Sequence, residues 1–192
     1  MIKRLLAVLL ILALLAGIFI GLMVLLQHGQ TLYLDLMYPL KYEDTIQMTS
    51  EEFGITPSLI AAVICVESRF DARAVSSAGA IGLMQITPET FDWLQNRLDV
   101  ESPLADTALS DPTVNIRYGT YDLLLMHEMF EDGDTALAAY NAGQGTVREW
   151  LSDSRYSDDG VHLKEIPYEE TAQYVKRVRK AQTMYRERYG LE

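Results

Sequence analysis

The sequence contains little that could cross-link the chain or hold a metal ion. Its 192 residues include a single cysteine, Cys65, so an intramolecular disulfide and a cysteine-based metal cluster are both excluded. Cys65 falls in an apolar stretch, where a buried free thiol is expected. The three histidines do not have the spacing of metal ligands. We therefore expect neither a metal site nor a bound cofactor.

Basic residues are also too few to build a surface for nucleic acid. The chain has 16 Lys and Arg against 27 Asp and Glu, a formal net charge of −11. Binding to nucleic acid depends on Lys and Arg that neutralise phosphates, so this balance argues against a nucleic-acid partner. A neutral glycan would not be affected by the same charge.

A long apolar run separates the N-terminus from the rest of the chain. Every residue from Leu5 to Leu26 is apolar or glycine, long enough for a helix with a rise of about 1.5 Å per residue to cross a bilayer. Lys3 and Arg4 precede the run, and the next basic residue is Lys41, so the positive-inside rule places the N-terminus in the cytoplasm. We predict a single-pass protein of the cell membrane with cytoplasmic residues 1–4, a transmembrane anchor at 5–26, a juxtamembrane connector at 27–41 and one extracytoplasmic domain at 42–192.

A cleaved signal peptide is the alternative interpretation of the apolar run. A signal peptide usually has a shorter apolar region that ends at a cleavage site with small residues. Residues 24–29, Val-Leu-Leu-Gln-His-Gly, offer no good site of that kind. The anchor is therefore the favoured prediction.

The domain is predicted to be mainly α-helical, with at most a small β-hairpin. A capping residue followed by proline, a pair typical of helix starts, occurs at Thr56-Pro57 and again at Asp111-Pro112. Small residues between positions 71 and 85 interrupt the helical pattern and predict a tight loop or a short hairpin. The predicted helices span 42–53, 57–70, 112–130, 134–143 and 169–189.

One acidic residue lies where the second of these helices should face the core. Ile60 and Ile64 share a helix face with Glu67, at positions i, i+4 and i+7. Burying an unpaired carboxylate is unfavourable, so such a group keeps its proton and its pKa rises. A protonated acid of this kind can donate to the departing oxygen of a glycosidic bond. Alternatively, Glu67 pairs with Arg69 or Arg73, or turns to solvent at the helix end.

Four short motifs follow one another in the domain. They are Glu67–Phe70, Gly82–Gln85, Ala139–Gly143, and Ile166–Thr171 together with Tyr174-Val175. In this order they resemble the motifs of the soluble lytic transglycosylase family, over about residues 42–189. The resemblance implies a lysozyme-like, mostly helical fold with a glycan groove, and peptidoglycan glycan strands as the substrate.

The resemblance also implies a mechanism. Glu67 would be the catalytic acid/base, which protonates the oxygen between N-acetylmuramic acid and N-acetylglucosamine and then takes a proton from the muramic C6 hydroxyl as it attacks C1. Because the substrate supplies the attacking group, one acid suffices where glycosidases generally need two carboxylates. Asp71 is expected to cap the helix end or to pair with Arg73. The implied substrate-binding residues are Ser68, Met84, Gln85, Tyr140, Asn141, Glu170 and Tyr174.

Two other functions remain open at this stage. The first is a muramidase similar to goose-type lysozymes, which hydrolyses the bond and needs an added carboxylate to position the attacking water. The sequence shows no certain candidate for that carboxylate. The second is a membrane-tethered, non-catalytic scaffold that binds the cell wall, for which Glu67→Gln would leave the biological function intact.

Overall fold

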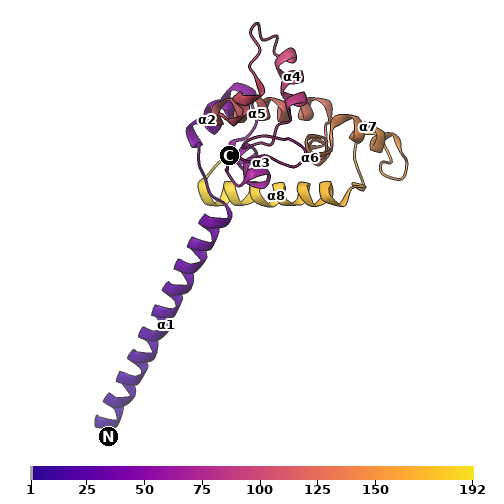
Figure 1. Cartoon of the computed structure of the whole chain (residues 1–192). Coiled ribbons are helices and arrows are strands. Elements are labelled where there is room, and N and C mark those ends of the chain that lie inside the picture. The colour runs from indigo at the N-terminus through magenta and orange to yellow at the C-terminus, as the bar shows by residue number, and fades with distance from the viewer. Residues whose placement is uncertain (1) are drawn as a thin grey trace. The chain divides into compact units, whose positions relative to one another are not determined.

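The computed structural model describes residues 2–192, which form two units. The first unit ends at Pro39 and the second spans Leu40–Glu192. Figure 1 shows the first unit as one long helix, α1 (Ile2–Met37), and the second as a set of shorter helices joined by loops. Each unit is described here by itself.

Helix α1 is apolar and continues past the predicted anchor. The stretch Leu14–Met37 is long and apolar enough to cross a membrane, and none of it is buried within the protein, although a signal sequence near the N-terminus would meet the same criterion. The predicted connector at 27–41 is helical up to Met37. Met1 and the side chains of Lys3 and Arg4, on which the predicted orientation rests, lie outside the described part of the chain.

The second unit is mainly α-helical, as predicted. Asp111 begins α5 by accepting hydrogen bonds from the backbone N–H groups of Thr113 and Val114, at 2.9 and 3.1 Å. Asp132 begins α6 in the same way with Thr135, at 2.8 Å. The helices of this unit are α2 (Glu43–Phe53), α3 (Pro57–Ser68), α4 (Pro88–Arg97), the 3-10 helix η1 (Asp106–Ser110), α5 (Pro112–Met129), α6 (Gly133–Ala142), α7 (Gln144–Ser152) and α8 (Glu169–Tyr189).

Helix α3 forms the centre of the core. Every residue from Pro57 to Cys65 is buried, because the helix is apolar on all sides and needs neighbours around its whole circumference. Helix α8 packs along it, and α5 packs against α2 and α6 (Figure 1). This packing holds the last turn of α3, which carries Glu67, next to the N-terminal half of α8.

The small β-hairpin predicted between α3 and α4 is absent from the described residues. Only isolated bridges occur there, between Val75 and Ile81 and between Ile81 and Ile86. Gly79, Gly82 and Gln85 all have positive φ values, so the chain turns too often for a strand ladder to extend. Side chains take over part of the hydrogen bonding that a sheet would provide.

Helices α4 and α7 were not predicted from the sequence. Helix α4 begins with Thr87-Pro88, the same pair of capping residue and proline found at the starts of α3 and α5, and the Thr87 side chain accepts from the Thr90 N–H at 3.1 Å. In α7, Val147 and Trp150 form a short buried stripe at i and i+3. Both helices are short, with 10 and 9 residues, so few apolar positions recur in each.

Candidate active site

Glu67 lies in the last turn of α3, where the backbone changes direction sharply. The helix ends at Ser68, two residues before the predicted end, because Arg69 and Phe70 both adopt left-handed conformations with φ of 52° and 62°. Positive φ is unfavourable for residues with a Cβ, and such strained positions concentrate at functional sites. The turn is secured because the Phe70 side chain is fully buried.

The surroundings of Glu67 favour its protonated form. Burial raises the pKa of Glu67 to about 7, while Tyr174 and then Arg177 act in the opposite direction and lower it. The Tyr174 hydroxyl is buried and, in the described part of the chain, has no hydrogen-bond partner at normal distance, so it acts on the Glu67 carboxyl from slightly further away. A carboxylic acid with a pKa near neutrality can both donate and accept a proton.

The ion pairs considered for Glu67 from the sequence do not form. No salt bridge involves Glu67 in the described structure, and the cation that acts on it is Arg177 rather than Arg69 or Arg73. Asp71 is exposed and accepts a 2.9 Å hydrogen bond from the backbone N–H of Arg73, so it stabilises the turn that follows α3 and does not cap the helix end.

Ser68 and Gln85 connect α3 to the following turn. The Ser68 hydroxyl lies 2.8 Å from the carbonyl oxygen of Leu83 and 3.1 Å from that of Ile64. The Gln85 side chain donates to the carbonyls of Gly82 and Ala74, at 2.9 and 3.3 Å. Both side chains hold the turn in this structure, and their predicted contacts with substrate stay predictions.

Tyr140 and Met84 are joined at the wall of the site. The Tyr140 hydroxyl donates a 2.8 Å hydrogen bond to the Met84 carbonyl, and burial together with the nearby Asp122 and Glu67 carboxyls raises the pKa of Tyr140 well above 10. Tyr140 therefore remains a neutral donor. The Met84 side chain is fully buried beside Gly119, so its predicted substrate contact would require it to move.

The remaining predicted residues lie where α6 ends and α8 begins. Asn141 is exposed, and its side-chain oxygen accepts a 2.8 Å hydrogen bond from the hydroxyl of Thr171. Glu170 is exposed in the first turn of α8, and Tyr174 is buried one turn later beside Glu67. The structure thus brings Glu67, Tyr140 and Tyr174 together and leaves Glu170 at the surface.

Tyr140 also lines a cleft of about 310 Å³. Glu67 is not among the residues that line this cleft, and Tyr140 connects the two because it lines the cleft and interacts electrostatically with Glu67. The lining includes Asp122, a carboxyl that is itself buried. Burial raises the pKa of Asp122 to about 7. The lining residues are Glu89, Thr90, Trp93, Asp122, Met126, Ala139, Tyr140, Gly143 and Gln144.

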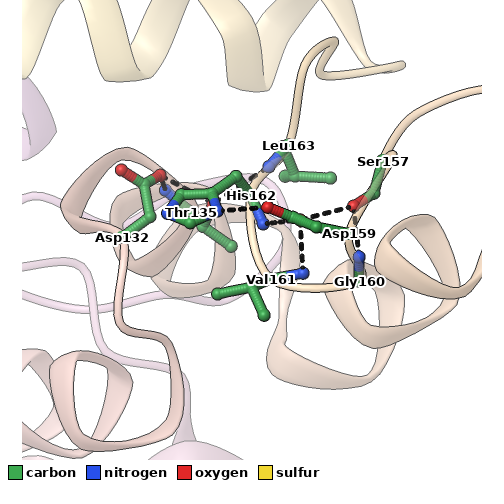
Figure 2. Close-up of polar contacts among 8 residues, drawn as sticks. All are labelled: Asp132, Thr135, Ser157, Asp159, Gly160, Val161, His162 and Leu163. Carbon is green, nitrogen blue, oxygen red and sulfur yellow. Dashed lines mark hydrogen bonds and ion pairs between the residues drawn. The ribbon is translucent and has the colours of Figure 1, made fainter.

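The loop between α7 and α8 is fixed at one point by a cluster of polar contacts. Figure 2 shows His162 pointing toward Asp159, and the His162 Nδ1 atom lies 2.6 Å from the Asp159 carboxylate. The same carboxylate accepts from the backbone N–H groups of Val161 and His162, both at 2.8 Å, and these bonds hold its pKa well below the usual range. A bond of 3.5 Å from the Leu163 N–H to the Thr135 hydroxyl ties the loop to α6. The contacts therefore fix the position of the loop that precedes α8.

Two groups of the site were missed from the sequence. Arg177 is exposed on α8, and it is close enough to Glu67 to lower the pKa of that carboxyl. Asp122 lies among apolar residues of α5, and a carboxyl at a core position was a signal available in the sequence.

The sequence matches the Transglycosylase SLT domain family over residues 44–162. It is 35% identical to the soluble lytic murein transglycosylase of Escherichia coli (strain K12), over 80% of this chain and 24% of that protein. It is 30% identical to the membrane-bound lytic murein transglycosylase C of Actinobacillus pleuropneumoniae serotype 5b (strain L20), over 76% of this chain and 46% of that protein.

The fold is similar to solved structures of lytic transglycosylases. It matches an inactive glutamate-to-glutamine variant of the lytic transglycosylase Slt from Pseudomonas aeruginosa with a TM-score of 0.72 and 34% identity, over 82% of this chain and 26% of that one. It matches the 70-kDa soluble lytic transglycosylase of Escherichia coli with the same TM-score and 32% identity, again over 82% and 26%. The chain spans about a quarter of the length of these soluble relatives. Because both its sequence and its fold match, the chain belongs to the transglycosylase SLT domain family.

Proposed function

We propose that the protein is a peptidoglycan lytic transglycosylase that cleaves the β-1,4 bond between N-acetylmuramic acid and N-acetylglucosamine without water. The observation that carries the proposal is the state of Glu67, a half-buried carboxyl with a pKa near 7 and no salt bridge to any described residue. The relatives of known activity support the same assignment.

The proposed reaction uses one acid twice. Glu67 donates its proton to the bridging oxygen as the bond from that oxygen to C1 of the muramic residue breaks. The carboxylate then accepts the proton of the muramic C6 hydroxyl as that oxygen bonds to C1, which closes a 1,6-anhydro ring and restores the acid. The Tyr174 hydroxyl lies beside Glu67 and lowers its pKa, so it can stabilise the carboxylate that exists between the two proton transfers.

Digestion of purified sacculi tests the proposal. The full chain in detergent micelles should release muropeptides with anhydro ends, which are lighter by one water than the reducing ends made by hydrolysis. Glu67→Gln keeps the size of the side chain but cannot supply the proton, so it should release none. Reducing ends would show a muramidase, and a wild-type protein with no products would favour the wall-binding scaffold.

We further propose that α1 anchors the domain on the outer side of the membrane. The apolar side chains described from Leu14 to Leu26 are exposed, a state that lipid would stabilise and water would not. Sedimentation of the protein with membranes after carbonate extraction tests the anchor. N-terminal sequencing of the mature protein distinguishes it from a cleaved signal peptide, because cleavage would remove the residues of α1.

A further inference from the structure

The carboxyl of Asp122 has no hydrogen-bond or ion-pair partner among the described residues. The residue is only 8% exposed, and no hydrogen bond or salt bridge reaches its carboxyl from the described residues. The shift of its pKa is caused by burial alone, which shows that no neighbouring cation or donor stabilises its charge. Nearly all buried polar groups in native proteins are satisfied. An exception on the wall of a cleft indicates a ligand that satisfies it.

The cleft that Asp122 lines has the composition of a sugar site. Trp93 on α4 is half-buried there and presents apolar ring surface, which suits the C–H face of a hexose. Glu89, Thr90 and Gln144 supply polar groups around it. The volume of about 310 Å³ lies at the lower end of the usual range for small-molecule sites, about 300–1,000 Å³, and suits one sugar unit of a strand.

We propose that Asp122 is a specificity-determining residue that recognises one N-acetylhexosamine of the glycan strand in the cleft beside Trp93. The neutral carboxylic acid donates its O–H to the acetamido carbonyl, and its other oxygen accepts from a neighbouring sugar hydroxyl. The inference rests on the proposed function, because it assumes that a glycan occupies the site. It adds a binding residue that none of the four motifs contains.

No cation among the described residues contributes to the pKa of Asp122, which burial alone raises. Tyr140 on α6 and Tyr174 on α8 are neutral phenols. The Asp122 and Glu67 carboxyls contribute to raising the pKa of both. Glu89 of α4 lines the same cleft and adds a second acidic group. The cation of the same helix, Arg117, is paired with Glu52 of α2 at 2.6 Å. Asp106 in η1 is also acidic and is exposed.

Glycan binding should therefore depend on pH. The acetamido carbonyl only accepts hydrogen bonds, so the proposed bond from Asp122 to it requires the protonated carboxyl, and ionisation of Asp122 removes that bond. Above the pKa of Asp122, binding takes up one proton, and the affinity should fall about tenfold for each unit of pH.

Calorimetric titration with the tetramer of N-acetylglucosamine tests the inference. The protein is the full chain in micelles carrying Glu67→Gln, which stops turnover and removes the titration of Glu67. Its affinity should be constant below about pH 6.5 and fall above about pH 7.5. Adding Asp122→Asn, an amide that donates and accepts but never ionises, should keep the low-pH affinity within about threefold and abolish the dependence on pH. Adding Asp122→Ala should weaken binding at low pH by about tenfold or more.

Three results would overturn the inference. They are a pH dependence that persists in Asp122→Asn, an unchanged affinity in a folded Asp122→Ala, and an equal effect of Asp122→Ala on the glucose tetramer, which lacks the acetamido group. Failure of the proposed function would appear elsewhere, as the absence of anhydro ends from sacculi. Because the titration uses an inactive variant, the two failures are distinguishable.

Discussion

Asn115 accepts a 2.8 Å hydrogen bond from the backbone N–H of Met84 and so fastens the turn after α3 to helix α5. Its side-chain nitrogen donates to the carbonyls of Ile81 and Leu109, both at 2.9 Å. Asn115 is fully buried, so no solvent can replace these bonds. The Asn115 amide therefore holds in place the segment that contains Met84, whose carbonyl accepts the hydrogen bond from the Tyr140 hydroxyl.

Asn115→Ala should be strongly destabilising. The change removes three buried hydrogen bonds and leaves the Met84 N–H and the Leu109 carbonyl without the Asn115 partner, while the Ile81 carbonyl keeps its bond from the Ile86 N–H; the free energy of unfolding should fall by about 3 kcal/mol. Urea denaturation of the full chain in micelles measures the loss. Asn96→Ala, at an exposed position of α4, is the control and should change stability by less than about 0.5 kcal/mol. Equal effects would show that the turn does not depend on Asn115.

Gly82 and Gly79 form a matched pair for substitution by alanine. Both have φ of +82°, so alanine is strained at either position by about 1–2 kcal/mol. At Gly82 the new Cβ would also lie 2.3 Å from Asn115 Nδ2 and 2.5 Å from the Leu109 carbonyl oxygen, whereas at Gly79 nothing lies within 4 Å. Gly82→Ala should therefore lower the melting temperature much more than Gly79→Ala. Similar losses would refute the close packing of the turn.

The activity on sacculi should decline as pH rises through about 7. In the proposed reaction Glu67 must carry a proton to donate it to the bridging oxygen, and its pKa is raised to about 7, so the active form is present below that pH and lost above it. Arg177 lowers this pKa. Arg177→Gln should thus move the alkaline limb of the kcat profile upward by about 0.5 pH unit. Lys176→Gln, at an exposed neighbouring position, should leave the limb in place. A downward shift in Arg177→Gln would contradict the electrostatic assignment.

Asp122→Asn should stabilise the folded protein at neutral and alkaline pH. The pKa of Asp122 is raised from an ordinary 3.8 to about 7 on folding, so the folded state binds the proton more tightly and the carboxyl destabilises it increasingly between those values. The gain from asparagine should be absent below about pH 4 and reach on the order of 2–4 kcal/mol above pH 7. Thermal unfolding across this range measures the gain. A gain that does not change with pH would show that the carboxyl is not the cause.

Most of the helices and the central acid were predictable because their signals are local. A capping residue followed by proline marks the starts of α3 and α5, and the apolar periodicity places Glu67 on a buried face. The family membership predicted from the motifs is confirmed by the match over residues 44–162. Of the two structures predicted between positions 71 and 85, a tight loop or a short hairpin, the structure has the loop, which is held partly by Asn115, a residue distant in the sequence.

The sequence by itself determined the mainly helical fold and the family, since each depends on signals carried by residues close together in the chain, and the same kind of signal selected Glu67 as the proposed acid. Tertiary structure alone decided what surrounds that acid. Arg177 and Tyr174 reach Glu67 because α8 packs along α3, and Asp122 reaches the cleft because α5 packs against α6. Burial and charge are set by neighbours that lie up to about a hundred residues away, so the pKa values of both carboxyls follow from packing and not from local pattern.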